Sequence, residues 1–152
     1  MENALNTHNK EEYPPMHTCE HILNGTIVRM FGCPRAFTTH IERKKSKIDL
    51  HCDRAPTPEE LRRIEETVNE VIARELDVTE EIVSRTEAAD LYDLSRLPEE
   101  AGETLRIVHV GDYDACPCIG QHVSNTREIP PMRIVSADWN EGVLRVRFKF
   151  RT

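Results

Sequence analysis

The chain has 152 residues and carries 27 acidic against 20 basic side chains, which gives a formal net charge of −7 at pH 7. This length is typical of one domain with its own core, and 38% hydrophobic with 31% charged residues indicates a globular protein rather than a disordered or fibrous one. The acidic balance argues against a broad nucleic-acid-coating surface.

No segment of the sequence is apolar enough to cross a membrane. The longest unbroken apolar run is residues 71–73, whereas a spanning helix needs about 20 residues. Residues 1–10 lack the apolar centre of a secretory signal, so we expect a cytoplasmic protein. Five cysteines, an odd number, then favour thiols or metal ligands over a disulfide framework.

The first third of the chain predicts a tail, a helix and a hairpin. Residues 1–13 hold almost nothing to bury and predict a flexible polar tail, which leaves 14–152 as a single domain. Prolines at the start and Gly32 at the end bracket apolar residues at helical spacing, which predicts a helix over residues 15–31. Alternating apolar residues on both sides of a basic turn at 43–46 then predict a hairpin.

A second helix has the clearest start signal in the sequence. Thr57 can cap it, Pro58 fits its first position, Glu60 completes a capping box, and one apolar stripe continues to Leu76. Hairpins and helices without a repeated strand–helix–strand rhythm predict an α+β fold, with a largely antiparallel sheet packed against two main helices. The other expected elements are a strand over 78–86, a short helix over 87–94, a loop through Pro98 and Gly102, a strand over 105–110, a loop over 111–131, and strands over 132–137 and 143–150.

Two pairs of residues have the spacing of metal ligands. His17 and His21 lie one turn apart on the expected first helix, so both imidazoles can reach one ion. Cys118 and His122 repeat that spacing in a loop, where Gly120 permits a tight turn. Together they would supply the nitrogen and sulfur donors that zinc prefers. Spacing alone favours a zinc site and ordinary structural roles equally.

The segments around these pairs resemble a known family. MHTCEHIL at residues 16–23 and GDYDACPCIGQHVSNTREI at residues 111–129 are similar to the second additional domain of threonyl- and alanyl-tRNA synthetases, which free-standing alanyl-tRNA editing proteins share. The family pattern is His-x-x-x-His near a helix start and Cys-x-x-x-His far downstream, followed by Asn-Thr-x-Glu-Ile. The resemblance covers roughly residues 14–150. With only a short tail in front, the chain resembles the minimal, trans-acting form.

The resemblance implies a fold like that of the second additional domain and an editing activity. It implies a zinc site at His17, His21, Cys118 and His122. It also implies hydrolysis of the ester that joins a wrong amino acid, such as serine or glycine, to the 3′ acceptor end of tRNA. An aminoacyl ester is already activated, so such a protein mainly has to place water and stabilise an oxyanion.

Several neighbouring residues depart from the family pattern or are open to two interpretations. Gln121 stands where synthetase-linked forms usually have threonine or proline. Gln121, Thr18 and the Gly120 backbone are the best candidates for contacts to the substrate, although Thr18 can equally bond its own helix. We expect Glu20 to be solvated, with support of an imidazole ligand as the less favoured alternative, and Cys19 to be a small core residue rather than a spare ligand. No general base stands out, so the catalytic residue stays unassigned.

Two basic clusters are candidates for contacts to tRNA phosphates. Cations crowd the first hairpin turn, and others alternate with apolar residues along the last strand, which puts them on one face. A solvated sheet face is an equal alternative. Residues 56–103 hold 15 acidic and 5 basic side chains, so the acidity lies away from both clusters. The clusters are Arg43, Lys44, Lys45 and Lys47, and Arg145, Arg147, Lys149 and Arg151.

Two other functions compete with tRNA editing. One is a non-catalytic module that keeps the fold and a closed structural zinc, since four protein ligands already complete a tetrahedron. The other is a hydrolase of another small aminoacyl ester. The sequence leaves open which amino acid and tRNA are used and whether the chain forms a homodimer.

Overall fold

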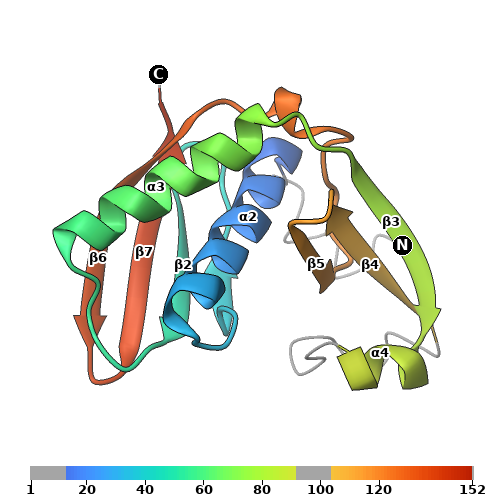
Figure 1. The fold of residues 1–152 in the computed structure, drawn as a ribbon, viewed down its shortest axis with the longest axis horizontal. Helices are drawn as coiled ribbons and strands as arrows, with labels where there is room; N and C mark the ends of the chain where they lie inside the picture. Colours follow the sequence, from blue (N-terminus) through green and yellow to red (C-terminus); the bar gives the residue numbers. More distant parts are fainter. Residues whose placement is uncertain (1–12, 92–103, 152) are drawn as a thin grey trace.

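The structure is a computed structural model that describes residues 13–91 and 104–151. The expected tail, apart from residue 13, and the expected loop through Pro98 and Gly102 lie outside the described residues. The described elements are two long helices, two short ones and two antiparallel sheets, so the predicted α+β class is confirmed. Figure 1 shows that the strands form two separate sheets rather than the single sheet that we expected.

Both long helices begin and end where local sequence signals placed them, to within a few residues. Helix α2 (Pro14–Phe31) starts with proline and ends at Gly32, whose left-handed φ of 68° lets its N–H bond the Val28 carbonyl. Helix α3 (Pro58–Ala73) has the predicted capping box between Thr57 and Glu60. It ends three residues before the predicted Leu76.

The four-stranded sheet carries the larger part of the core. It runs β1 (Thr38–His40), β2 (Ser46–His51), β7 (Val143–Phe150) and β6 (Met132–Asn140), each antiparallel to the next. Its inner residues, such as Ile48, Val146 and Phe148, are fully buried in one cluster with the apolar sides of α2 and α3. The predicted turn between β6 and β7 has left-handed residues at Glu141 and Gly142.

The three-stranded sheet contains an element that sequence patterning missed. It runs β3 (Val78–Ser84), β4 (Thr104–Val110) and β5 (Asp114–Pro117), all antiparallel. Strand β5 lies inside the segment predicted as a loop. The expected short helix is α4 (Arg85–Leu91), which begins two residues early; residues 92–94 of that prediction lie outside the described residues. A 3-10 turn, η2 (Thr126–Glu128), precedes β6.

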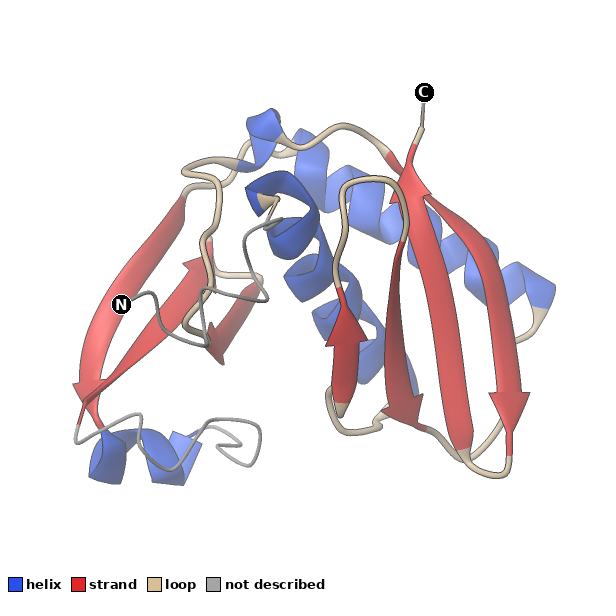
Figure 2. Cartoon of the chain, turned by 180° about the vertical axis from the view of Figure 1, so that it is seen from behind, coloured by secondary structure: helices blue, strands red, loops and turns tan. Residues whose placement is uncertain are grey.

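Helix α2 lies between the two sheets, as Figures 1 and 2 show from opposite sides. Residues Met16 and Thr18–Ile27 are therefore buried almost without interruption, polar side chains included. Helix α2 thus has both sheets as neighbours, and it carries the first pair of candidate ligands. None of the helices in the described part of the chain is long and apolar enough to span a membrane.

Candidate metal centre

The structure brings the two candidate ligand pairs to one place. His17 and His21 come from the first half of α2, and Cys118 and His122 come from the loop that follows β5. One donor atom from each of the four residues lies within 4.8 Å of all the others. Tetrahedral zinc with nitrogen and sulfur ligands needs donors about 3.3–3.8 Å apart. The cluster is therefore close to that geometry, and small rotations would complete it.

Hydrogen bonds orient two of the imidazoles toward the cluster. The Nδ1 of His17 lies 3.2 Å from the Gln121 carbonyl, which leaves its Nε2 facing the Cys118 Sγ at 3.5 Å. The Nδ1 of His122 lies 2.9 Å from the Thr18 hydroxyl. The Nε2 of His122 is buried and has no hydrogen-bond partner among the described residues. A buried nitrogen without a partner is costly, and a metal ion would satisfy it.

Burial and neighbouring charges also set the protonation of these rings. Burial, together with the nearby His21 and His17, lowers the pKa of His122 to about 2, so this imidazole is neutral as a metal ligand must be. Burial works to lower the pKa of His17, but the hydrogen bond and charge of Cys118 outweigh it and raise this pKa to about 9. His17 would therefore release a proton when a metal binds.

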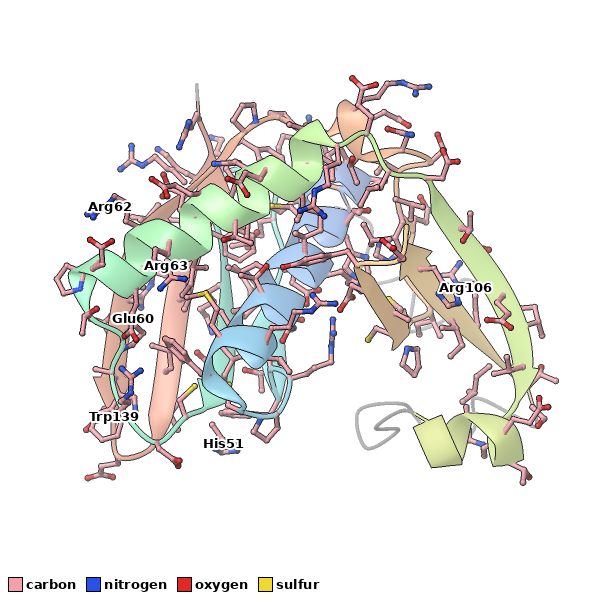
Figure 3. All side chains as sticks on the ribbon, viewed as in Figure 1. His51, Glu60, Arg62, Arg63, Arg106 and Trp139 are labelled. Carbon is pink, nitrogen blue, oxygen red and sulfur yellow. The ribbon has the colours of Figure 1, made fainter. Side chains whose placement is uncertain are left out.

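Arginine 106 holds the loop that carries Cys118. Its guanidinium on β4 donates to the Cys118 carbonyl at 2.9 Å and also to the Gly120 carbonyl. Figure 3 labels Arg106 on the three-stranded sheet, beside this loop. The Gly120 N–H in turn points at the Cys118 Sγ, 3.4 Å away. Sequence reasoning missed Arg106, because nothing local distinguishes it from any other strand arginine.

The Asn-Thr-x-Glu-Ile run anchors the other end of the loop. Asn125 donates from its amide to the Glu75 carbonyl and to Asp77. The Thr126 hydroxyl donates to the Ile72 carbonyl and accepts from the Leu76 N–H. These bonds fix residues 125–126 against the end of α3. They make the run a structural clamp for the segment that presents His122.

Glutamate 20 is buried, so the expectation that it is solvated is wrong. Only 4% of it is exposed, because α2 is covered by a sheet on each side. Its Oε1 lies 3.9 Å from the His17 Nε2 and 4.0 Å from the His21 Nε2. Its Oε2 accepts a hydrogen bond of 2.7 Å from Asn24. The carboxylate therefore borders the candidate metal centre.

A second buried carboxylate, Asp114 of β5, lies on the Nδ1 side of His21. Its Oδ2 is 3.9 Å from that nitrogen, and Arg35 binds both carboxylate oxygens at 2.7 and 3.3 Å. Burial raises the pKa of Asp114, although the Arg35 charge opposes that effect. A β-carbon at Gly25 would lie only 2.6 Å from Asp114 Oδ1, so α2 and β5 approach closely here.

The two remaining cysteines near the centre are not donors to it. Cys19 is fully buried, as expected of a core residue, and burial raises the pKa of its thiol. Burial likewise raises the pKa of Cys116 to about 12. Neither joins the four residues whose donor atoms converge.

The residues predicted to contact the substrate lie around the centre, and some of their polar groups already make hydrogen bonds within the protein. The Thr18 hydroxyl is fully buried and also accepts from the Val123 N–H at 3.2 Å. Gly120 is half-buried, and the exposed Gln121 lies at the outer edge of the centre, with its carbonyl on His17. Contacts of Thr18, Gly120 and Gln121 to a substrate stay predictions.

The basic clusters lie on the first turn of the four-stranded sheet and on its outer face, except for Arg151, which follows β7 and pairs with Glu65 of α3. Leu144, Val146 and Phe148 face the helices, so the alternating cations of β7 face away from them. Several of these cations are already paired, and their contacts to RNA stay predictions. The pairs are Arg145 and Lys47 with Asp49, Arg147 with Asp138, and Arg151 with Glu65, while Arg43 stacks on Tyr13.

The comparisons with known proteins relate this chain to part of the aminoacyl-tRNA synthetases. Residues 105–147, which include β4, β5, Cys118 and His122, match the threonyl and alanyl tRNA synthetase second additional domain. The resemblance to that domain is confirmed. The chain is also 34% identical over 134 residues to the alanine–tRNA ligase of Hyperthermus butylicus, and 35% identical over 132 residues to that of Fervidobacterium nodosum.

A third relative shows the same partial overlap. The chain is 36% identical over 142 residues to the alanine–tRNA ligase of Caldivirga maquilingensis. These matches cover 85–88% of this chain but only 14–16% of each ligase. The common part is therefore the second additional domain and its surroundings, and the activity of a whole ligase is not carried over.

Proposed function

We propose that the chain is a zinc-dependent aminoacyl-tRNA hydrolase that removes a wrong amino acid from tRNA in trans, in the cytoplasm. Serine or glycine on alanine tRNA is the favoured substrate. One observation carries the proposal: in a second additional domain, the donor atoms of His17, His21, Cys118 and His122 converge within 4.8 Å.

The donor set suits zinc better than the other common metals. Three imidazoles and one thiolate are the nitrogen and sulfur ligands that zinc prefers, whereas magnesium and calcium prefer oxygen. Bound zinc would supply a positive charge that polarises an ester carbonyl or lowers the pKa of a water molecule to about 7. His122 is held neutral and aimed by Thr18, and Arg106 fixes the loop around Cys118.

The residues at the outer edge would hold the substrate. Gln121 is exposed beside the centre, where its side chain can reach an aminoacyl group. Ile119, 48% exposed in the same loop, offers an apolar neighbour. Arginines and lysines of the outer sheet face lie on the far side of the β7 backbone from the helices, so they would contact more distant tRNA phosphates.

A deacylation panel tests the proposal. Purified protein loaded with zinc is mixed with alanine tRNA that carries serine, glycine or alanine, and with threonine tRNA that carries serine. We expect hydrolysis of the serine or glycine esters on alanine tRNA, while the correct alanine ester remains. Variants His21→Ala and Cys118→Ala should lose both zinc and activity. Cys116→Ala is the matched control, because this thiol lies in the same segment but outside the donor cluster, and it should keep both.

One observation favours a second candidate function. All four donors are protein side chains, which is the composition of a closed structural zinc site. If the protein holds one zinc per chain while every aminoacyl-tRNA of the panel stays intact, the hydrolase proposal is wrong and the structural module is correct. Hydrolysis only of small aminoacyl esters would instead indicate a hydrolase of another small aminoacyl ester.

A further inference from the structure

The least expected feature of the centre is a buried carboxylate that lies next to two candidate ligands. The Glu20 side chain is 5% exposed; Glu20 stands three residues after His17 and directly before His21. Carboxylates are rarely buried unless they are paired or bound to a metal site. Among the described residues, no lysine or arginine lies within 4.0 Å of this carboxylate; its near partners are the two histidines and Asn24.

The orientation of Glu20 is imposed from outside the centre. The Ala36 N–H donates to the Asn24 Oδ1 at 2.9 Å, so the Asn24 amide must present its NH₂ group to Glu20. That group donates to Oε2 at 2.7 Å. The chain of bonds from Ala36 through Asn24 therefore leaves Oε1 directed at the two imidazoles.

The distances make Glu20 a neighbour of the ligands rather than a ligand. Its Oε1 lies 3.9 and 4.0 Å from the two Nε2 atoms, which is beyond hydrogen-bonding range. It is also not one of the donors that lie within 4.8 Å of all the others. Because Oε1 lies on the Nε2 side of both rings, it would act on an ion directly through its charge.

The charges of a bound ion, its four donors, Asp114, Arg35 and Glu20 would sum to zero. Arg106, which also borders the centre, is paired with Glu80. A divalent ion with one thiolate and three neutral imidazoles has a charge of +1 in a largely buried place. Asp114 contributes −1, but the bidentate Arg35 offsets it. Glu20 then supplies the remaining negative charge. Uncompensated charge is costly in a site of low dielectric, so this carboxylate would stabilise a bound cation.

We propose that Glu20 is a charge-compensating neighbour of the metal centre: a carboxylate, fixed by Asn24 and the Ala36 backbone, that offsets the charge of the ion bound beside His17 and His21. The proposal rests on the metal site of the proposed function, and it concerns affinity rather than the hydrolytic step. It also explains why an acidic residue is tolerated between two histidines on a buried helix.

The test is Glu20→Gln, which removes the charge but keeps the shape and an oxygen that can accept from Asn24. Zinc affinity is measured by competition with a chelator, and the coordination of cobalt(II) in the same site is followed by its visible absorption. We expect zinc to bind about 10- to 100-fold more weakly, the range typical of groups that neighbour metal ligands without binding the metal. The cobalt spectrum should keep its four-coordinate character. Glu66→Gln, an exposed position on α3, is the control and should change neither.

The outcomes separate this inference from the proposed function. Wild-type protein that binds no zinc overturns both. Wild-type binding with an unchanged affinity in Glu20→Gln overturns only the role of Glu20, and leaves it as a buried residue that stabilises α2 through Asn24. A change of coordination number in the cobalt spectrum also overturns it, because Glu20 would then be a ligand. In parallel, the thermal unfolding of metal-free Glu20→Gln is measured. A weaker zinc affinity supports the role of Glu20 only if this variant is folded before metal is added. If it is unfolded, the carboxylate serves folding and the inference is wrong.

Discussion

The close approach of α2 to β5 predicts that Gly25→Ala is destabilising, although alanine is the better helix former. A β-carbon at position 25 would lie 2.6 Å from the Asp114 Oδ1 and 3.3 Å from its Cγ. Asp114 cannot move away freely, since Arg35 holds both of its oxygens. One of the two must shift to relieve the contact.

The magnitude follows from two opposing effects. Replacing a glycine inside a helix by alanine stabilises it by about 1 kcal/mol. Overpacking of a buried position costs about 1–3 kcal/mol. The clash is between a new methyl group and a doubly held carboxylate, so we expect a net loss of about 1 kcal/mol. For a chain of this size, that loss lowers the midpoint of thermal unfolding by about 2–4 °C.

A double-mutant cycle isolates the contact. Thermal and urea unfolding are measured for Gly25→Ala, Asp114→Ala and the double variant. In the Asp114→Ala background the carboxylate is gone, so Gly25→Ala should become neutral or stabilising by up to about 1 kcal/mol. A stabilising effect of Gly25→Ala in the wild-type background would refute the reasoning, as would an equal cost in both backgrounds.

Three further predictions use other parts of the molecule. Thr57→Ala breaks the capping box of α3 and should lower the free energy of urea unfolding by about 1 kcal/mol, whereas Thr57→Ser should keep most of the wild-type stability. The hydrogen bonds from Arg145 hold the pKa of Asp49 below its usual value, so this carboxylate stabilises the fold above about pH 4 and loses that effect as pH falls through its lower folded pKa. Asp49→Asn should therefore be less stable at pH 7 and lose less stability between pH 5 and 3; an unchanged pH profile would contradict the pairing. Chelation of zinc should lower the unfolding midpoint, and free zinc at 100 times its Kd should add about 2.7 kcal/mol of stability; a midpoint independent of zinc would contradict the site.

The two long helices could be predicted because their signals are local. Thr57, Glu60 and the prolines act on the turn in which they stand, and Gly32 ends α2 by its own left-handed backbone. The same holds for the hairpins, whose alternation is read within a few residues. The fold class follows from these elements without knowledge of their contacts.

Strand β5 and the burial of Glu20 could not be predicted because both depend on distant contacts. Strand β5 has four residues, and it is a strand only because β4 pairs with it. Glu20 is buried because a second sheet covers the side of α2 that an ordinary surface helix exposes to water. A helix enclosed on both sides does not show the one-sided apolar stripe on which such predictions rely.

The candidate site likewise has a part that could be predicted from the sequence and a part that could not. Spacing and family resemblance selected the four residues that the structure brings together, although their role as ligands stays a proposal. The groups around them were not predictable: Arg106, which holds the Cys118 loop, comes from another strand, and Asn24, which orients Glu20, is fixed by the backbone of Ala36. The orientation of a ligand side chain depends on the assembled fold, whereas its chemical type is given by the sequence alone.

The separation of the ligands along the chain has a consequence for folding. His17 and Cys118 are 101 positions apart in a chain of 152 residues, so one ion bound between them closes the larger part of the chain into a loop. Closing a flexible loop of that length costs on the order of 4 kcal/mol of chain entropy, which a bound ion would have to overcome once. Whichever elements form first, the ion can bind tightly only after α2 and the loop beyond β5 have met. Metal binding would thus be a late step of folding that stabilises an already assembled topology. Removal of the metal would first destabilise the region where α2 lies between the two sheets.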